Sequence, residues 1–216
     1  MLRNFLVVAW RNLVKSRWYS LINTLGLSIG MAVALLIGLW IWDELSYDYY
    51  YYARHDRIVQ VVTTQTFNGQ TGTEQATSQP VGPYLRAHYP ADFLEVARGS
   101  WNYGHALAVG DKKISKNGMY VEPNFTKIIN LQMLSGSADA LKDPSAMLIS
   151  QSTAQALFGK DDPLNKTIQV DSKAVLKVAG VFADPPLNTS FYDTRILMSW
   201  DKYVGLRTRL RTNMNY

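Results

Sequence analysis

The stretch LINTLGLSIGMAVALLIGLWIW, residues 21–42, decides how this chain is organised. It has no charged residue, and its polar interruptions are Asn23, Thr24 and Ser28. A helix of this length extends roughly 33 Å, enough to cross a hydrocarbon core of about 30 Å. A secretory signal has a shorter apolar core that ends in small residues, whereas this stretch ends in Trp-Ile-Trp. We therefore expect a transmembrane helix over residues 19–45.

The charges on either side of this stretch indicate its orientation. Basic side chains precede it, at Arg3, Arg11, Lys15 and Arg17. Acidic side chains follow it, at Asp43, Glu44 and Asp48. Lys and Arg are retained on the cytoplasmic side of a membrane, so we expect the N-terminus in the cytoplasm and residues 46–216 outside it.

Residues 1–18 have an amphipathic pattern at helical spacing. Apolar side chains fall on one face, at Leu2, Phe5, Leu6, Ala9 and Leu13. Most of the polar and basic ones fall on the other, at Arg3, Asn4, Arg11 and Lys15. This pattern predicts a cytoplasmic helix lying in the lipid interface. The alternative is a positively charged segment without fixed structure.

Small residues recur at every fourth position of the predicted span: Gly26, Gly30, Ala34 and Gly38. Such a row lets a second helix approach closely, so it predicts a helix-packing seam. The alternative is that glycine is simply frequent in membrane helices.

Composition excludes two other classes of site. The net charge is +5, but the four basic residues before the span and four at Lys202, Arg207, Arg209 and Arg211 account for more than this excess. Without these eight, the charge is about −3, which leaves no basic face for nucleic acid. The chain has no cysteine, which excludes disulfides and Cys-ligated metal sites.

The region after the span has mixed helical and strand patterns, which predict an α+β domain. We expect strands over residues 58–67, 93–99, 105–114, 146–150, 167–170, 175–181 and 195–199. We expect helices over residues 81–89, 123–130, 138–141 and 153–158, with Ser152 as the N-cap of the last and Gly159 as its stop. Residues 68–79 are rich in Gly, Thr and Gln and indicate a loop.

Catalytic motifs are weak in this sequence. Gly159-Lys160 lacks the other residues of a phosphate-binding loop, and Ser150 lacks the flanking glycines of a hydrolase nucleophile. The three histidines, His55, His88 and His105, have no metal-ligand spacing. We therefore predict a non-enzymatic chain with no catalytic, cofactor or metal site of its own.

Several motifs resemble a known family. The most specific is the block after the span, Asp43, Glu44, Leu45, Ser46, Tyr47 and Asp48. Further similarities are Pro123-Asn124-Phe125, Asp162-Pro163-Leu164 and the segment VAGVFADPP at residues 178–186. Together they resemble the first transmembrane segment and periplasmic core domain of MacB/FtsX-like ABC transporter permeases, in a form abundant in Bacteroidetes. This sequence departs from the family pattern at Asn165, where glycine is usual, and at Ser190-Phe191, where Ser-His is common.

The resemblance implies a role in efflux or mechanotransmission in the bacterial inner membrane. A separate cytoplasmic ABC ATPase would bind ATP and Mg, a second permease copy would complete a dimer, and motion would reach a periplasmic adaptor or substrate protein. Family members continue into further spans, so we expect this chain to be truncated. The alternatives are a single-span membrane-anchored binding or sensor module and, third, a membrane-anchored enzyme.

Overall fold

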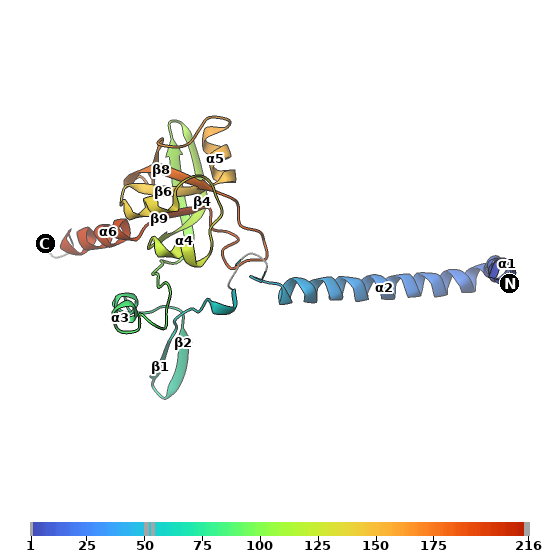
Figure 1. The fold of residues 1–216 in the computed structure, drawn as a ribbon. Helices are drawn as coiled ribbons and strands as arrows, with labels where there is room; N and C mark the ends of the chain where they lie inside the picture. The colour runs from blue at the N-terminus through green and yellow to red at the C-terminus, as the bar shows by residue number, and fades with distance from the viewer. Residues whose placement is uncertain (1, 50–51, 53–54, 214–216) are drawn as a thin grey trace. The chain divides into compact units, whose positions relative to one another are not determined.

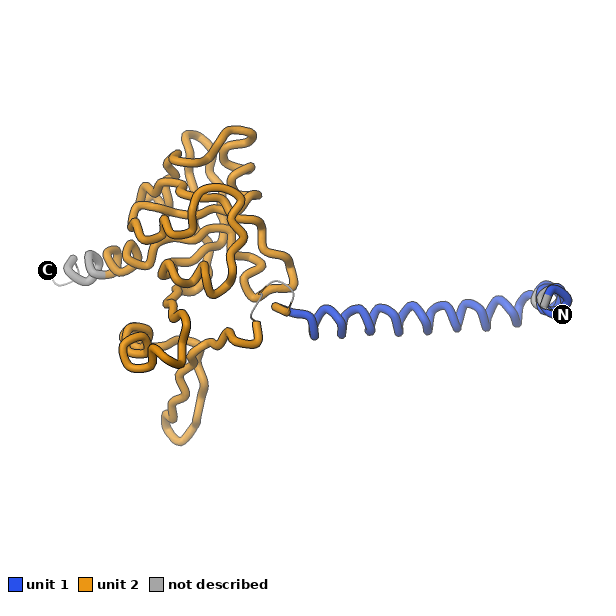
Figure 2. Tube along the Cα trace, viewed as in Figure 1, with its two compact units in different colours: residues 1–47 blue, residues 48–216 orange. Residues whose placement is uncertain are grey.

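A computed structural model of the chain describes residues 2–49, 52 and 55–213 (Figure 1). The chain divides into two units, Met1–Tyr47 and Asp48–Tyr216 (Figure 2). The first unit is helical, and the second contains the strands. The boundary falls between the last two residues of the block that follows the predicted span.

The first unit consists of helices α1 (Leu2–Lys15) and α2 (Arg17–Leu45). A helix is therefore present where the amphipathic pattern predicts one, and α2 covers the predicted span. By length and composition α2 is the one helix among the described residues that could cross a membrane. None of its described side chains is buried, although most are apolar. Water disfavours such a surface, so α2 needs lipid or other helices around it.

The second unit is an α+β domain, as predicted. Its strands are β1 (Thr63–Phe67), β2 (Gln70–Glu74), β3 (Tyr103–Val109), β4 (Lys112–Val121), β5 (Met133–Gly136), β6 (Ala146–Ser150), β7 (Thr167–Val170), β8 (Ala174–Phe182) and β9 (Ile196–Ser199). Its helices are α3 (Val81–His88), α4 (Asn124–Ile128), α5 (Gln151–Phe158) and α6 (Trp200–Asn213), with 3-10 turns η1 (His55–Arg57) and η2 (Ala138–Lys142).

Six strands close into a small barrel. The sheet order is β5-β8-β6-β9-β4-β3-β7, and β7 also pairs with β8, so the strands from β8 to β7 form a ring with β5 outside it. Most neighbours are antiparallel, but β4 pairs in parallel with β9 and β6 with β8. Figure 1 shows α5 and α6 beside this barrel. Closure removes exposed strand edges within the ring.

Alternating side chains of the barrel strands fill its interior. The alternation is clear in β7, where Ile168 and Val170 are buried and Thr167 and Gln169 are exposed. The buried apolar cluster inside the barrel contains side chains from all six strands of the ring, including Leu107, Tyr120, Ile149, Ile168, Leu176 and Ile196. A compact apolar core of this kind holds the loops at the ends of the strands in place.

Several predicted elements are present nearly as expected. Strands β6 and β7 have the predicted limits. Strand β8 is one residue longer than predicted at each end, and β9 begins one residue later than predicted. Gly159 ends α5 with a φ of 66°. The predicted cap of α5 was wrong, because Ser150 is the N-cap and its hydroxyl accepts a hydrogen bond from the Thr153 amide.

Other predicted elements were wrong for identifiable reasons. Residues 68–79 include β2, because Asn68 and Gly69 have φ values of 50° and 77° and turn the chain into a hairpin. Only residues from Thr63 onward have a partner strand, so residues 58–62 are not in β1. Gly110 turns the chain within residues 105–114 and divides them between β3 and β4. Residues 93–99 form no named strand, and β5 and α6 were not predicted.

Candidate functional site

The candidate site lies where the chain enters the second unit. Asp48 has a φ of 62°, in the left-handed region that Asp and Asn tolerate better than most side chains. Its amide donates to the carbonyl of Asn188 at 2.9 Å. The chain is therefore hydrogen bonded to the loop between β8 and β9 at the first residue of the domain.

The side chain of Asp48 reinforces this contact. Its Oδ1 accepts from the Ser190 amide at 2.7 Å, and its Oδ2 accepts from the Ser190 hydroxyl. A carboxylate that accepts two hydrogen bonds from one residue holds that residue in position and orientation. We call this set of three hydrogen bonds the exit contact.

The loop that receives Asp48 is itself fixed to the domain. Thr189 is fully buried and its hydroxyl donates to the carbonyl of Pro186 at 3.0 Å. The ring of Phe191 meets Tyr52 and Phe125 edge to face, with centroid separations of 6.3 and 5.2 Å. Since Phe125 lies on α4, the exit contact is connected to the body of the domain through packed aromatic rings.

The structure separates the six residues of the predicted membrane-exit motif. Asp43, Glu44 and Leu45 form the last turn of α2, and Ser46 and Tyr47 follow it in a turn. The Ser46 hydroxyl donates to the carbonyl of Asp43 at 3.2 Å. Asp48, the last residue of the motif, contacts the loop between β8 and β9. The motif thus combines a helix end with the first attachment point of the domain.

The four residues of the predicted seam lie along α2. A Cβ added at Gly26, Gly30 or Gly38 would meet no atom within 4 Å beyond the helix's own backbone, and Ala34 is exposed. The described part of this chain therefore leaves that row uncovered. Its role as a seam stays a prediction.

A second cluster of charged side chains joins α3 to the end of β4. Glu122 accepts from Arg86 at 2.7 and 3.1 Å and from the Arg98 side chain at 2.5 and 2.9 Å. Burial opposes the charged form of Glu122, but these hydrogen bonds outweigh burial and lower its pKa to about 2. The Arg98 guanidinium also lies 5.2 Å from the ring centroid of Trp200, the first residue of α6.

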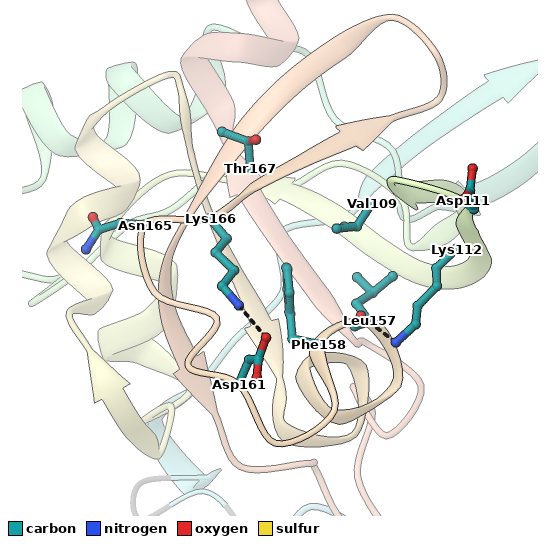
Figure 3. Close-up of a pocket in the computed structure, with 9 residues that line it drawn as sticks. All are labelled: Val109, Asp111, Lys112, Leu157, Phe158, Asp161, Asn165, Lys166 and Thr167. Atoms are coloured by element: carbon teal, nitrogen blue, oxygen red, sulfur yellow. Dashed lines mark hydrogen bonds and ion pairs between the residues drawn. The ribbon is translucent and has the colours of Figure 1, made fainter.

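A hollow of about 750 Å³ opens beside the end of α5 (Figure 3). Figure 3 shows Lys166 reaching toward Asp161, at 3.1 Å, and Lys112 reaching toward the carbonyl of Leu157, also at 3.1 Å. Both ammonium groups in the lining are therefore paired within the protein. The hollow lies away from the exit contact, and its side chains do not form a catalytic set.

The residues considered for catalysis have structural surroundings. Ser150 is fully buried as the cap of α5, where a substrate could not reach it. His55 packs on Tyr49, His88 stacks on Tyr84, and buried His105 lies 2.7 Å from Asp171. Within residues 2–49, 52 and 55–213, no three His, Cys, Asp or Glu side chains gather as metal ligands would.

The sequence profile of the MacB-like periplasmic core domain matches residues 20–215. This match includes all of α2 except its first three residues, the exit contact and the whole described barrel. The chain belongs to the MacB-like periplasmic core domain family. The family predicted from the motifs is therefore confirmed.

Solved structures of similar fold include a domain assigned to a permease protein from Porphyromonas gingivalis, with 26% identity, a TM-score of 0.51 and coverage of 60% of this chain and 55% of that one. A second is the periplasmic region of MacB from Actinobacillus actinomycetemcomitans, with 16% identity, a TM-score of 0.46 and coverage of 57% of this chain and 55% of that one. A third is the extracellular domain of the ABC-type transporter YknZ from Gram-positive bacteria, with 16% identity, a TM-score of 0.40 and coverage of 49% of this chain and 54% of that one. The chain spans about half the length of these solved domains. No match is found among curated proteins.

Sequence reasoning missed half of the exit contact in this MacB-like domain. It singled out Asp48 but noted Ser190 only as a departure from the family pattern. The two residues are 142 positions apart, so no local spacing connects them. The glutamate and two arginines of the second cluster were also missed, since they come from three separate segments.

Proposed function

We propose that this chain is part of the permease subunit of an ABC transporter. Helix α2 would cross the bacterial inner membrane, with α1 in the cytoplasmic interface and the MacB-like domain in the periplasm. The observation that carries this proposal is an unburied apolar helix of 29 residues, directly followed by a domain of this family. Such a helix is about 43 Å long, more than a bilayer core requires.

The proposed role of the domain is to convert movement of the helix into periplasmic work. A cytoplasmic ABC ATPase would bind and hydrolyse ATP, and a second permease copy would move with the first. Two residues separate the end of α2 from Asp48, so little slack exists between the helix and the exit contact. The aromatic rings around Phe191 would then pass displacement to the domain, and from there to an adaptor or substrate protein. Domains of this family are typically non-catalytic, which fits a mechanical role.

The seam on α2 would be the contact face for a neighbouring membrane helix. Gly30 lies at its centre, and a side chain there would keep two helix backbones apart. The free surface along Gly26, Gly30 and Gly38 supports this use. A lone anchor gains nothing from such a face, whereas a transporter bundle does.

Topology is the first test. Because the chain has no native cysteine, a single introduced cysteine is the only thiol that a labelling reagent can modify. Single cysteines replace Leu94 in the domain and Phe5 in α1, two side chains that are 83% and 81% exposed. In cells with a permeabilised outer membrane, a membrane-impermeant maleimide should label Leu94→Cys and leave Phe5→Cys unlabelled until the inner membrane is opened. The reverse labelling would overturn the proposed orientation.

Coupling is the second test. In a permease that contains this chain, co-expressed with its partner ABC ATPase, Gly30→Leu should reach the membrane at the normal level but lose assembly or stimulation of ATPase activity. Leu36→Ile, off the seam, is the matched control and should have no effect. If Gly30→Leu assembles and stimulates normally, the seam has no packing role and the anchored binding or sensor module becomes the better reading. A reading frame without further spans, or without a neighbouring ATPase gene, would favour the same alternative.

A further inference from the structure

An apolar tip stands next to the exit contact, on the loop between β8 and β9. Leu187 is 80% exposed at this tip, and Tyr192 is also exposed. Residues 185–192 read PPLNTSFY and carry no charged side chain. Leu187 therefore offers apolar surface, in an uncharged loop, that a lipid bilayer could cover.

The hydrogen bonds of the loop fix where this tip is presented. Asn188, the neighbour of Leu187, accepts from the Asp48 amide at 2.9 Å. The next residue, Thr189, is fully buried, and Tyr192 donates its amide to the Thr189 carbonyl at 3.0 Å. Leu187 is therefore exposed on a loop that is held in place by these hydrogen bonds and by buried Thr189.

Chain length places this tip near the end of α2. Asp48 is three positions after Leu45, the last residue of α2, so the path between them is at most about 11 Å. Leu187 lies one residue from the carbonyl bound to Asp48. A short stretch of chain and one hydrogen bond therefore connect the tip to the end of the helix, where Trp40 and Trp42 are residues typical of the headgroup region.

We propose that Leu187 and Tyr192 insert into the outer headgroup and acyl boundary of the bilayer, so that the domain has a second, peripheral contact with lipid. This proposal rests on the proposed membrane insertion of α2. Leucine supplies apolar surface and tyrosine suits the headgroup level. The absence of charge from residues 185–192 lowers the cost of bringing the tip to the acyl boundary. The tip and the span would fix the domain at two points.

Fluorescence quenching in vesicles tests this directly. The full chain carries a single NBD-labelled cysteine at Leu187, at Val175 or at Leu36, and is reconstituted into vesicles of phosphatidylcholine and phosphatidylglycerol with nitroxides on shallow or deep acyl carbons. Val175 is the matched control, because it is an exposed apolar residue at the opposite end of β8 from this loop, roughly 20 Å away. Leu36 reports insertion of α2.

We expect shallow nitroxides to quench the label at Leu187 at least about twofold more than the label at Val175. In a chain labelled at Tyr192→Cys, the added substitution Leu187→Asp should reduce quenching, which separates the native leucine from the label's own affinity for lipid. Equal quenching at Leu187 and Val175, with Leu36 quenched by deep nitroxides, would overturn the tip proposal and leave the anchoring intact. Loss of quenching at Leu36 as well would overturn both.

Discussion

Asp48→Ala is the substitution that should weaken the exit contact most. It removes two hydrogen bonds to a charged acceptor, each worth about 1 kcal/mol once solvent access to Ser190 is allowed for. It also places alanine at a φ of 62°, which costs about 1 kcal/mol more. The expected total is about 3 kcal/mol.

Two further substitutions separate these contributions. Asp48→Gly removes the carboxylate but adopts the same φ easily, so we expect a loss of about 2 kcal/mol. Asp48→Asn keeps an acceptor oxygen and tolerates the left-handed region, so we expect about 1 kcal/mol. From least to most destabilising, the order should therefore be Asp48→Asn, Asp48→Gly and Asp48→Ala.

Urea unfolding of the full chain in detergent micelles, followed by circular dichroism of the sheet, measures these losses. Amide hydrogen exchange at Ser190 should also accelerate in all three variants, because the Ser190 amide loses the charged carboxylate of Asp48 as its acceptor. Asp92→Ala, at an exposed position, is the matched control. Unchanged unfolding midpoints together with unchanged exchange at Ser190 would refute the reasoning. Combined with Ser190→Ala, Asp48→Ala should show a coupling of about 1 kcal/mol.

Three other predictions concern the domain. Glu122→Gln should reduce the free energy of unfolding by roughly 2 to 3 kcal/mol at pH 7, as measured by urea unfolding. Because the pKa of Glu122 in the folded protein is lowered to about 2, this difference from wild type should be complete above about pH 4.5 and should vanish as the pH falls toward 2. Gly118→Ala should reduce the stability of the domain by about 3 kcal/mol, because the new Cβ would lie 2.0 Å from Ile196. Gly72→Ala, in a strand but with open space around it, should reduce stability much less. Equal shifts in melting temperature for the two variants would contradict this packing argument. Asn165→Val should cost about 1 to 2 kcal/mol since Asn165 has a φ of 62°, while Asn165→Gly should be nearly neutral in the same melt; a stable valine variant would count against the left-handed turn.

The parts of the fold that could be predicted are those with local causes. The apolar run of α2, the alternation in β7 and the stop at Gly159 each follow from neighbouring residues. Asn165 is also explained locally, because asparagine is the side chain that best replaces glycine at positive φ. The turn at Asn68-Gly69 was available to the same reasoning and was overlooked.

The parts that could not be predicted depend on distant partners. Closure of the barrel requires β7 to pair with β8 on one side and β3 on the other, which no single segment specifies. Strand β5 is short and half exposed, so its pattern is weak without β8 beside it. The charge cluster likewise forms only when Arg86, Arg98 and Glu122 meet.

The separation of Asp48 and Ser190 along the chain sets an order for biogenesis. The exit contact joins residues 142 positions apart, so during synthesis the helix leaves the ribosome long before the loop that will hold its end. The entropic cost of closing a loop rises by only about 0.6 kcal/mol for each doubling of its length. In the proposed topology, however, the exit contact must wait until the loop between β8 and β9 has crossed the membrane. Until then the nascent domain is tethered at one end only. A translocation arrest before Ser190 would therefore leave a span that is inserted yet mechanically disconnected.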